Sequence, residues 1–175
     1  MRKRVMSPAP PEAATPEPEW LDLEQLAKVE VTSEDAANPI EGALVPGEES
    51  GWRAAQPGEQ TIRLTFDRPL RVSRMWLLFI EADTTRTQEF VLRWSPDGGR
   101  SFREILRQQW NFGPPETIRE AEDYRVELTG VTVLELAITP DKSGGEARAS
   151  PRPPPPATWA ASGRPGSGDA DRAPR

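Results

Sequence analysis

The chain contains no cysteine and no histidine. It therefore has no disulfide, no thiolate metal ligand and no zinc site of the usual Cys/His kind. The same absences exclude Ser-His-Asp and Cys-His catalytic arrangements and any imidazole general base. Carboxylate chemistry remains open, as do magnesium or calcium sites built from oxygen ligands. The composition favours a protein that binds over an enzyme, and we expect no cofactor.

Long apolar runs are also missing. No stretch of roughly 18 apolar residues exists, so the sequence predicts no membrane span. The N-terminal MRKR cluster leads directly into proline and glutamate. It lacks the apolar run of about 7 to 15 residues that a secretory signal peptide needs, and we therefore expect a cytoplasmic location. The formal net charge of −6 argues against a nucleic-acid partner, because neutralising phosphates requires a basic surface.

The two ends differ in composition from the middle. Residues 1–19 are rich in proline, alanine and glutamate, and residues 143–175 are rich in glycine, proline and arginine. Such segments bury too little apolar surface to offset the entropy lost on ordering. The PPPP run also disfavours a central strand. We predict two disordered Pro-rich tails around one domain over residues 20–142.

Within this domain the apolar residues recur with the period of β-strands. A short helical turn is predicted over residues 20–27, with Leu23 and Leu26 facing inward. Asp97-Gly98-Gly99 predicts a hairpin, because Asp-Gly supplies the positive φ that tight turns require. No long amphipathic helix separates the strands. The pattern predicts an all-β fold, an antiparallel jelly-roll β-sandwich. The predicted strands are residues 28–32, 61–66, 71–80, 89–95, 102–106, 123–128 and 133–139.

The order of several segments resembles the discoidin, or coagulation-factor C-type, domain, which has the galactose-binding-like architecture. The segments that carry the resemblance are Ile40-Glu41-Gly42, Gly51-Trp52, the strand from Gly58 to Phe66, Arg68 to Val72, Val91 to Gly99 followed by Phe102, Tyr124 to Leu128, and Leu134 to Leu136. The resemblance implies a non-enzymatic module. Modules of this family bind carbohydrates, lipid head groups or proteins through loops at one end of the sandwich.

The chain departs from the family in two places. Members often carry Asp-Gly-Asp before the tryptophan, where oxygens bind a structural calcium, whereas this chain has Glu41-Gly42-Ala43. The family also runs a last strand back beside the first, whereas here the chain meets PRPPPP after Ser150. We therefore consider the hypothesis that the residues after about Ser150 do not descend from the domain, for example through a change of reading frame.

Two predicted loops supply the candidate binding residues. Trp110, Asn111 and Phe112 fall in a predicted loop over residues 108–115, where an aromatic face could stack on a sugar ring or another apolar group and the amide could orient it. The alternative is that the two aromatics close the open end of the core. Arg86 and Gln88 fall in a polar loop over residues 81–89 and offer hydrogen bonds to a ligand. An exposed turn without a ligand has the same composition.

Other residues have simpler interpretations. The tryptophans at 52, 76 and 94 are expected in the core. Glu48 and Glu49 are expected to be solvated rather than metal ligands. Glu120, Glu122 and Asp123 could be proposed as a pair of hydrolytic carboxylates, and a hydrolase is the least favoured function. The PRPPPP segment is either a ligand for an aromatic groove or a plain tail.

The leading prediction is a non-catalytic module that binds carbohydrate through its end loops. The choice of carbohydrate as the ligand class rests on the family resemblance alone. The alternative is a cytoplasmic protein–protein interaction module, which the absence of a signal peptide favours.

Overall fold

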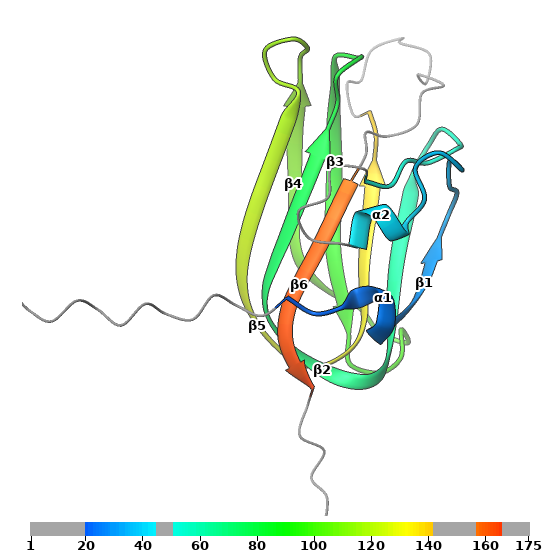
Figure 1. The fold of residues 1–175 in the computed structure, drawn as a ribbon. Coiled ribbons are helices and arrows are strands. Elements are labelled where there is room, and N and C mark those ends of the chain that lie inside the picture. The colour runs from blue at the N-terminus through cyan, green and yellow to red at the C-terminus, as the bar shows by residue number, and fades with distance from the viewer. Residues whose placement is uncertain (1–19, 45–50, 142–156, 166–175) are drawn as a thin grey trace, which may run out of the picture.

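A computed structural model describes residues 20–44, 51–141 and 157–165 (Figure 1). Strands dominate it, and the two helices have four residues each. None of the helices in these three segments is long and apolar enough to cross a membrane. The elements in chain order are α1 (Leu23–Leu26), β1 (Ala27–Val31), α2 (Glu41–Leu44), β2 (Gln60–Ile80), β3 (Arg86–Ser95), β4 (Arg103–Phe112), β5 (Arg119–Thr139) and β6 (Ala157–Pro165).

The strands form two antiparallel layers, because β2 and β5 are long enough to belong to both. Residues 60–66 of β2 pair with β1 and with residues 133–138 of β5, which continue to β3 and then to β4. Residues 70–80 of β2 pair with residues 119–131 of β5 and, on the other side, with β6. One layer thus has five strands and the other three. The predicted all-β sandwich is confirmed.

The long strands bend between segments that were predicted as separate strands. Four strands were expected over residues 61–66, 71–80, 123–128 and 133–139, and the structure joins them into two. The β2–β5 register shifts between Thr65 and Leu70, and Gly130 of β5 has a φ of 75°. Glycine tolerates this positive φ, so β5 changes direction without ending. Each strand therefore crosses from one layer to the other.

The core lies between the two layers. Phe79 of β2, in the three-stranded layer, packs on Phe90 of β3 and Trp110 of β4, in the five-stranded layer, with centroid distances of 5.3 and 4.9 Å. Leu23 of α1 is fully buried as predicted, whereas Leu26 is 37% exposed and its predicted inward orientation is wrong. The remaining large buried side chains include Trp52, Ile62, Leu64, Met75, Leu77, Leu92, Leu134, Leu136 and Ile138.

The outer face of the five-stranded layer carries a buried carboxylate. Glu135 of β5 is 3% exposed and forms salt bridges with Arg63 of β2 (2.6 Å) and Arg93 of β3 (2.8 Å). The Phe102 ring lies 5.7 Å from the Arg63 guanidinium and 5.9 Å from that of Arg93. Two cations and one ring thereby cover the only carboxylate of this cluster, which ties three neighbouring strands together.

The β3–β4 hairpin is built as the sequence predicts. Gly98 and Gly99 have φ values of 73° and 87°, which side chains other than glycine adopt at a cost. Asp97 accepts hydrogen bonds from the Ser95 hydroxyl and from the hydroxyl and backbone N–H of Ser101. These bonds favour the ionised carboxylate and hold the Asp97 pKa well below its usual range, led by the Ser101 hydroxyl.

The predicted tail after residue 142 is wrong for residues 157–165, which form β6. This strand pairs antiparallel with β2 from Phe79 to Leu70, and the Ala161 side chain is fully buried in the core. The prolines end before the strand begins, so PPPP does not interrupt the ladder. Residues after Ser150 thus supply a strand of the sandwich, which argues against the reading-frame hypothesis. The predicted tails over residues 1–19, 143–156 and 166–175 lie outside the described residues.

The connections separate into two ends. Ile80 pairs with Arg119 and Arg86 pairs with Phe112, so loops 81–85 and 113–118 lie at the same end as the start of β2. We call this the loop end. The hairpin over residues 96–102 and the bends of β2 and β5 lie at the opposite end (Figure 1). The two segments predicted to carry the candidate binding residues, 81–89 and 108–115, both reach this loop end.

Candidate functional site

Trp110 and Phe112 do not form an exposed loop. Both belong to β4, where they are 6% and 1% exposed, and their rings lie 6.5 Å apart. Trp110 also packs on Phe79 and Phe90, each at 4.9 Å between centroids. The strand continues to Phe112 because β3 already begins at Arg86 and pairs with it. The predicted aromatic platform is therefore wrong as an exposed surface, and the alternative, closure of the core, is what the structure has.

Arg86 is buried in an ion pair instead of reaching into solvent. Its guanidinium lies 2.6 Å from the Glu81 carboxylate, and the two side chains are about equally buried. The other carboxylate oxygen of Glu81 accepts hydrogen bonds from the backbone N–H groups of Asp83 (2.9 Å) and Thr84 (3.0 Å). The pair thus fixes the turn over residues 81–85. Arg86 shapes the loop end without being exposed on it, which corrects its predicted place in a loop.

Gln88 is also buried, at 0% exposure, and lies on β3 opposite Trp110. Among the described residues, neither its amide oxygen nor its amide nitrogen has a hydrogen-bond partner. It points to the same side of β3 as the fully buried Phe90, since residues two apart in a strand share a face. The predicted exposed position of Gln88 is wrong, and its unsatisfied amide has an energetic cost.

Asn111 is the one exposed residue of the five candidates. It lies between Trp110 and Phe112 on β4, so it points to the opposite face of the strand. The Thr87 hydroxyl donates a hydrogen bond to its amide oxygen at 2.8 Å. This bond orients the amide at the solvent face near the loop end, where the prediction for Asn111 still stands.

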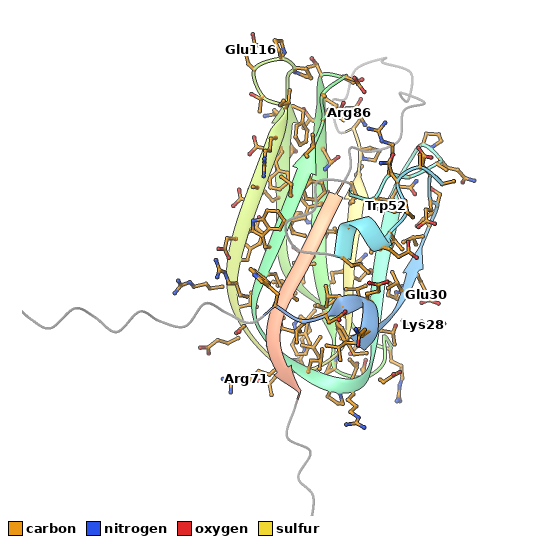
Figure 2. All side chains as sticks on the ribbon, viewed as in Figure 1. Lys28, Glu30, Trp52, Arg71, Arg86 and Glu116 are labelled. Atoms are coloured by element: carbon orange, nitrogen blue, oxygen red, sulfur yellow. The ribbon has the colours of Figure 1, made fainter. Side chains whose placement is uncertain are left out.

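The loop over residues 113–118 lies beside these residues and was not singled out as a whole from the sequence. Its Gly113 N–H donates to the Thr117 carbonyl at 3.0 Å, and the Pro114–Pro115 bond is cis. Ile118 is 38% exposed, and its carbonyl accepts a hydrogen bond from the Glu81 N–H at 2.8 Å. Figure 2 shows Glu116 at the tip of the loop end and Arg86 below it. The Gly-Pro-Pro sequence signals a turn but gives no indication of its neighbours.

Of the acidic residues considered for hydrolysis, Glu122 and Asp123 do not face each other. Glu122 and Asp123 are consecutive in β5, so their side chains leave opposite faces of the strand. The Glu122 carboxylate accepts a hydrogen bond from the Gln108 amide at 3.2 Å. Burial raises the pKa of the nearby Tyr124 hydroxyl above its usual value. Asp123 pairs with Arg74, whose hydrogen bonds lower the Asp123 pKa. Glu122 and Asp123 therefore belong to separate structural contacts, and Glu120 shares the face of β5 on which Glu122 lies.

Metal ligands are not clustered in the part of the chain that the structure describes. There, no three acidic side chains lie close enough together to hold an ion. Glu48 and Glu49 lie outside the described residues, so the interpretation of that pair is not tested. Trp52 is fully buried, as predicted, and its indole N–H donates to the Ser33 carbonyl at 3.2 Å. Trp76 and Trp94 are half-buried.

No model of a known protein family matches the sequence, and no curated protein matches it. Solved structures do match. The third carbohydrate-binding module of family 32 from a family 31 glycoside hydrolase of Clostridium perfringens is 16% identical, with a TM-score of 0.56 over 83% of this chain and 95% of that one. This chain has the galactose-binding-like fold. The discoidin-like architecture that the sequence resembles is therefore confirmed at the level of the fold.

Two further structures extend the similarity. The family 32 module of C. perfringens NanJ, in complex with galactose, is 10% identical, with a TM-score of 0.54 over 81% of this chain and 96% of that one. A GH29 fucosidase of Ruminococcus gnavus in complex with fucose is 11% identical, with a TM-score of 0.58 over 82% of this chain. This chain spans only 27% of the fucosidase. Similar structures thus include isolated binding modules and parts of glycoside hydrolases.

Proposed function

We propose that this chain is a non-catalytic carbohydrate-binding module. The observation that supports it is the likeness of the whole sandwich to modules described with bound sugars, galactose in one and GalNAc-β-1,3-galactose in another, both from C. perfringens. The absence of histidine and cysteine removes most catalytic arrangements and agrees with a binding role. The predicted cytoplasmic location stays a prediction.

The exposed residues of the loop end are the proposed contact surface. The Asn111 amide, oriented by Thr87, offers hydrogen bonds to sugar hydroxyls. Ile118 offers a small apolar surface to the C–H face of a sugar ring, and Glu116 accepts hydrogen bonds beside it. Beneath them, the Glu81–Arg86 ion pair and the buried aromatics hold both strands in place. Rigid support of this kind lowers the entropy cost of binding.

A glycan array probed with the full chain tests this proposal, followed by titration calorimetry on each hit. Asn111→Ala and Ile118→Ala are expected to weaken binding about tenfold each, because each removes one direct contact. Leu26→Ala is the matched control, since Leu26 is equally exposed (37% against 38%) and far from the loop end. The array is probed both with calcium and with chelator.

Two results would overturn the proposal. One is an array without any hit at protein concentrations that detect millimolar affinity. The other is a hit that Leu26→Ala weakens as much as Ile118→Ala, which would place the contact elsewhere. A protein captured through the loop end, with no glycan bound, would instead support the alternative interaction module.

A further inference from the structure

A hollow of about 310 Å³ opens on the three-stranded layer, away from the loop end. Its described lining comes from two adjacent strands, Arg71 and Ser73 of β2 and Arg125, Val126 and Glu127 of β5. Figure 2 shows Arg71 at the end of the sandwich opposite Arg86 and Glu116. The volume lies at the lower limit of small-molecule sites, which suits one sugar-sized ring.

An irregularity in the ladder creates this hollow. Val72 pairs with Leu128 and Arg74 pairs with Arg125, so one residue of β2, Ser73, lies opposite two residues of β5. A bulge of this kind bends the strand and redirects its side chains. Because Val72 is fully buried, its neighbours in β2 point to the solvent face, where the hollow lies. The site is therefore a product of the fold and is open to solvent.

The charges in the hollow are incompletely balanced. Arg71 and Arg125 are exposed, and neither forms a salt bridge within the described part of the chain, where Arg63, Arg74 and Arg93 all do. The charge of Arg125 helps to lower the Asp123 pKa, but Asp123 accepts its hydrogen bonds from Arg74. Glu127 contributes one negative charge. The described lining thus has two guanidinium groups for one carboxylate, on a chain whose net charge is −6.

This combination selects the chemistry of the occupant. Guanidinium groups bind carboxylates through paired N–H donors. Glu127 repels a second negative charge, which disfavours dianionic phosphates, and it accepts hydrogen bonds from hydroxyl groups. We propose that the hollow is a second binding site, for a hydroxylated ring that carries a single carboxylate, such as a uronic acid. It does not depend on the function proposed for the loop end.

Titration of the ¹⁵N-labelled full chain with glucuronic acid, followed by amide chemical shifts, tests this site. Glucose serves as the neutral counterpart, because it differs from glucuronic acid only at C6, where a hydroxymethyl group replaces the carboxylate. We expect glucuronic acid to shift the amides of Arg71, Ser73 and Arg125, and glucose to leave them unchanged. The shifts should weaken as salt is added, since exposed charges are screened. A di-glucuronide tests whether the site binds a single sugar ring or a ring within an oligosaccharide.

Charge variants make the test specific. Arg71→Gln and Arg125→Gln are each expected to raise the Kd for glucuronic acid about three- to tenfold. Glu127→Gln should lower it, because the repulsion of the carboxylate is removed. Arg103→Gln is the matched control, since it removes an exposed arginine from β4, in the other layer.

The proposal is overturned if glucuronic acid leaves the three amides unshifted, if glucose shifts them equally, or if Arg103→Gln weakens binding as much as Arg125→Gln. None of these results bears on the loop end, where neutral sugars are expected to shift residues 113–118. Failure of one site is therefore distinguishable from failure of the other.

Discussion

Replacing Gln88 by leucine is expected to stabilise the protein. Gln88 is 0% exposed, and its amide oxygen and nitrogen have no hydrogen-bond partner among the described residues. A buried polar group left without a partner costs about 1–3 kcal/mol, because it gave up its bonds to water and gained none. Leucine has a similar size and carries no polar atom, so it suits the apolar contacts around Phe90 and Trp110.

The magnitude follows from this cost. Strain from the branched side chain offsets part of this cost, so we expect Gln88→Leu to raise the free energy of unfolding by about 1–2 kcal/mol. For a chain of this size, each kcal/mol raises Tm by about 2–4 °C. Urea denaturation should show a higher midpoint at an unchanged m-value, which indicates a change in stability rather than in compactness.

Gln109→Leu is the matched control. Gln109 belongs to β4 and is exposed, so the same substitution there should change stability by less than about 0.5 kcal/mol. If Gln88→Leu lowers Tm while the control does not, the amide has a partner such as a buried water, and the reasoning about its cost is wrong. Equal gains at both positions would also refute it, because general hydrophobicity would then explain them.

Three other changes test the core, the charged cluster and the hairpin. Trp110→Ala should destabilise the fold by about 3–5 kcal/mol in urea denaturation, as expected of a buried ring, whereas a loss below 1 kcal/mol would contradict its place in the core. Glu135→Gln should lower the free energy of unfolding by about 1–2 kcal/mol by the same measurement. This is less than for a fully buried pair, because Arg63 and Arg93 are partly hydrated. An unchanged midpoint would show that the cluster does not contribute to stability. The Asp97 pKa is lower in the folded state, so its contribution to stability is present above the unfolded pKa of about 3.9 and is lost as the pH falls. The Tm difference between wild type and Asp97→Asn should therefore shrink from pH 6 to pH 2, and a difference independent of pH would contradict the assigned bonds.

Local patterns in the sequence determined the strands and their tightest turn. Alternation of apolar and polar residues identifies strands because successive side chains leave opposite faces, wherever the partner strands lie. The Asp97-Gly98-Gly99 hairpin needs only its own residues to supply the positive φ values. The order of these segments was enough to indicate the discoidin-like sandwich, since the fold depends on the sequence of strands and turns more than on any single side chain.

Tertiary structure decided which faces of the strands are buried, and therefore which residues form the exposed site. Trp110 alternates with polar neighbours, but its burial depends on Phe79, a residue 31 positions earlier that packs on it from the other layer. The sequence alone suggests that Arg86 is exposed to solvent, but it is buried because Glu81 supplies a buried counter-charge. β6 shows no strong pattern of its own and is defined by hydrogen bonds to β2. Burial and strand pairing depend on two segments together, so the sequence of one segment alone does not determine them.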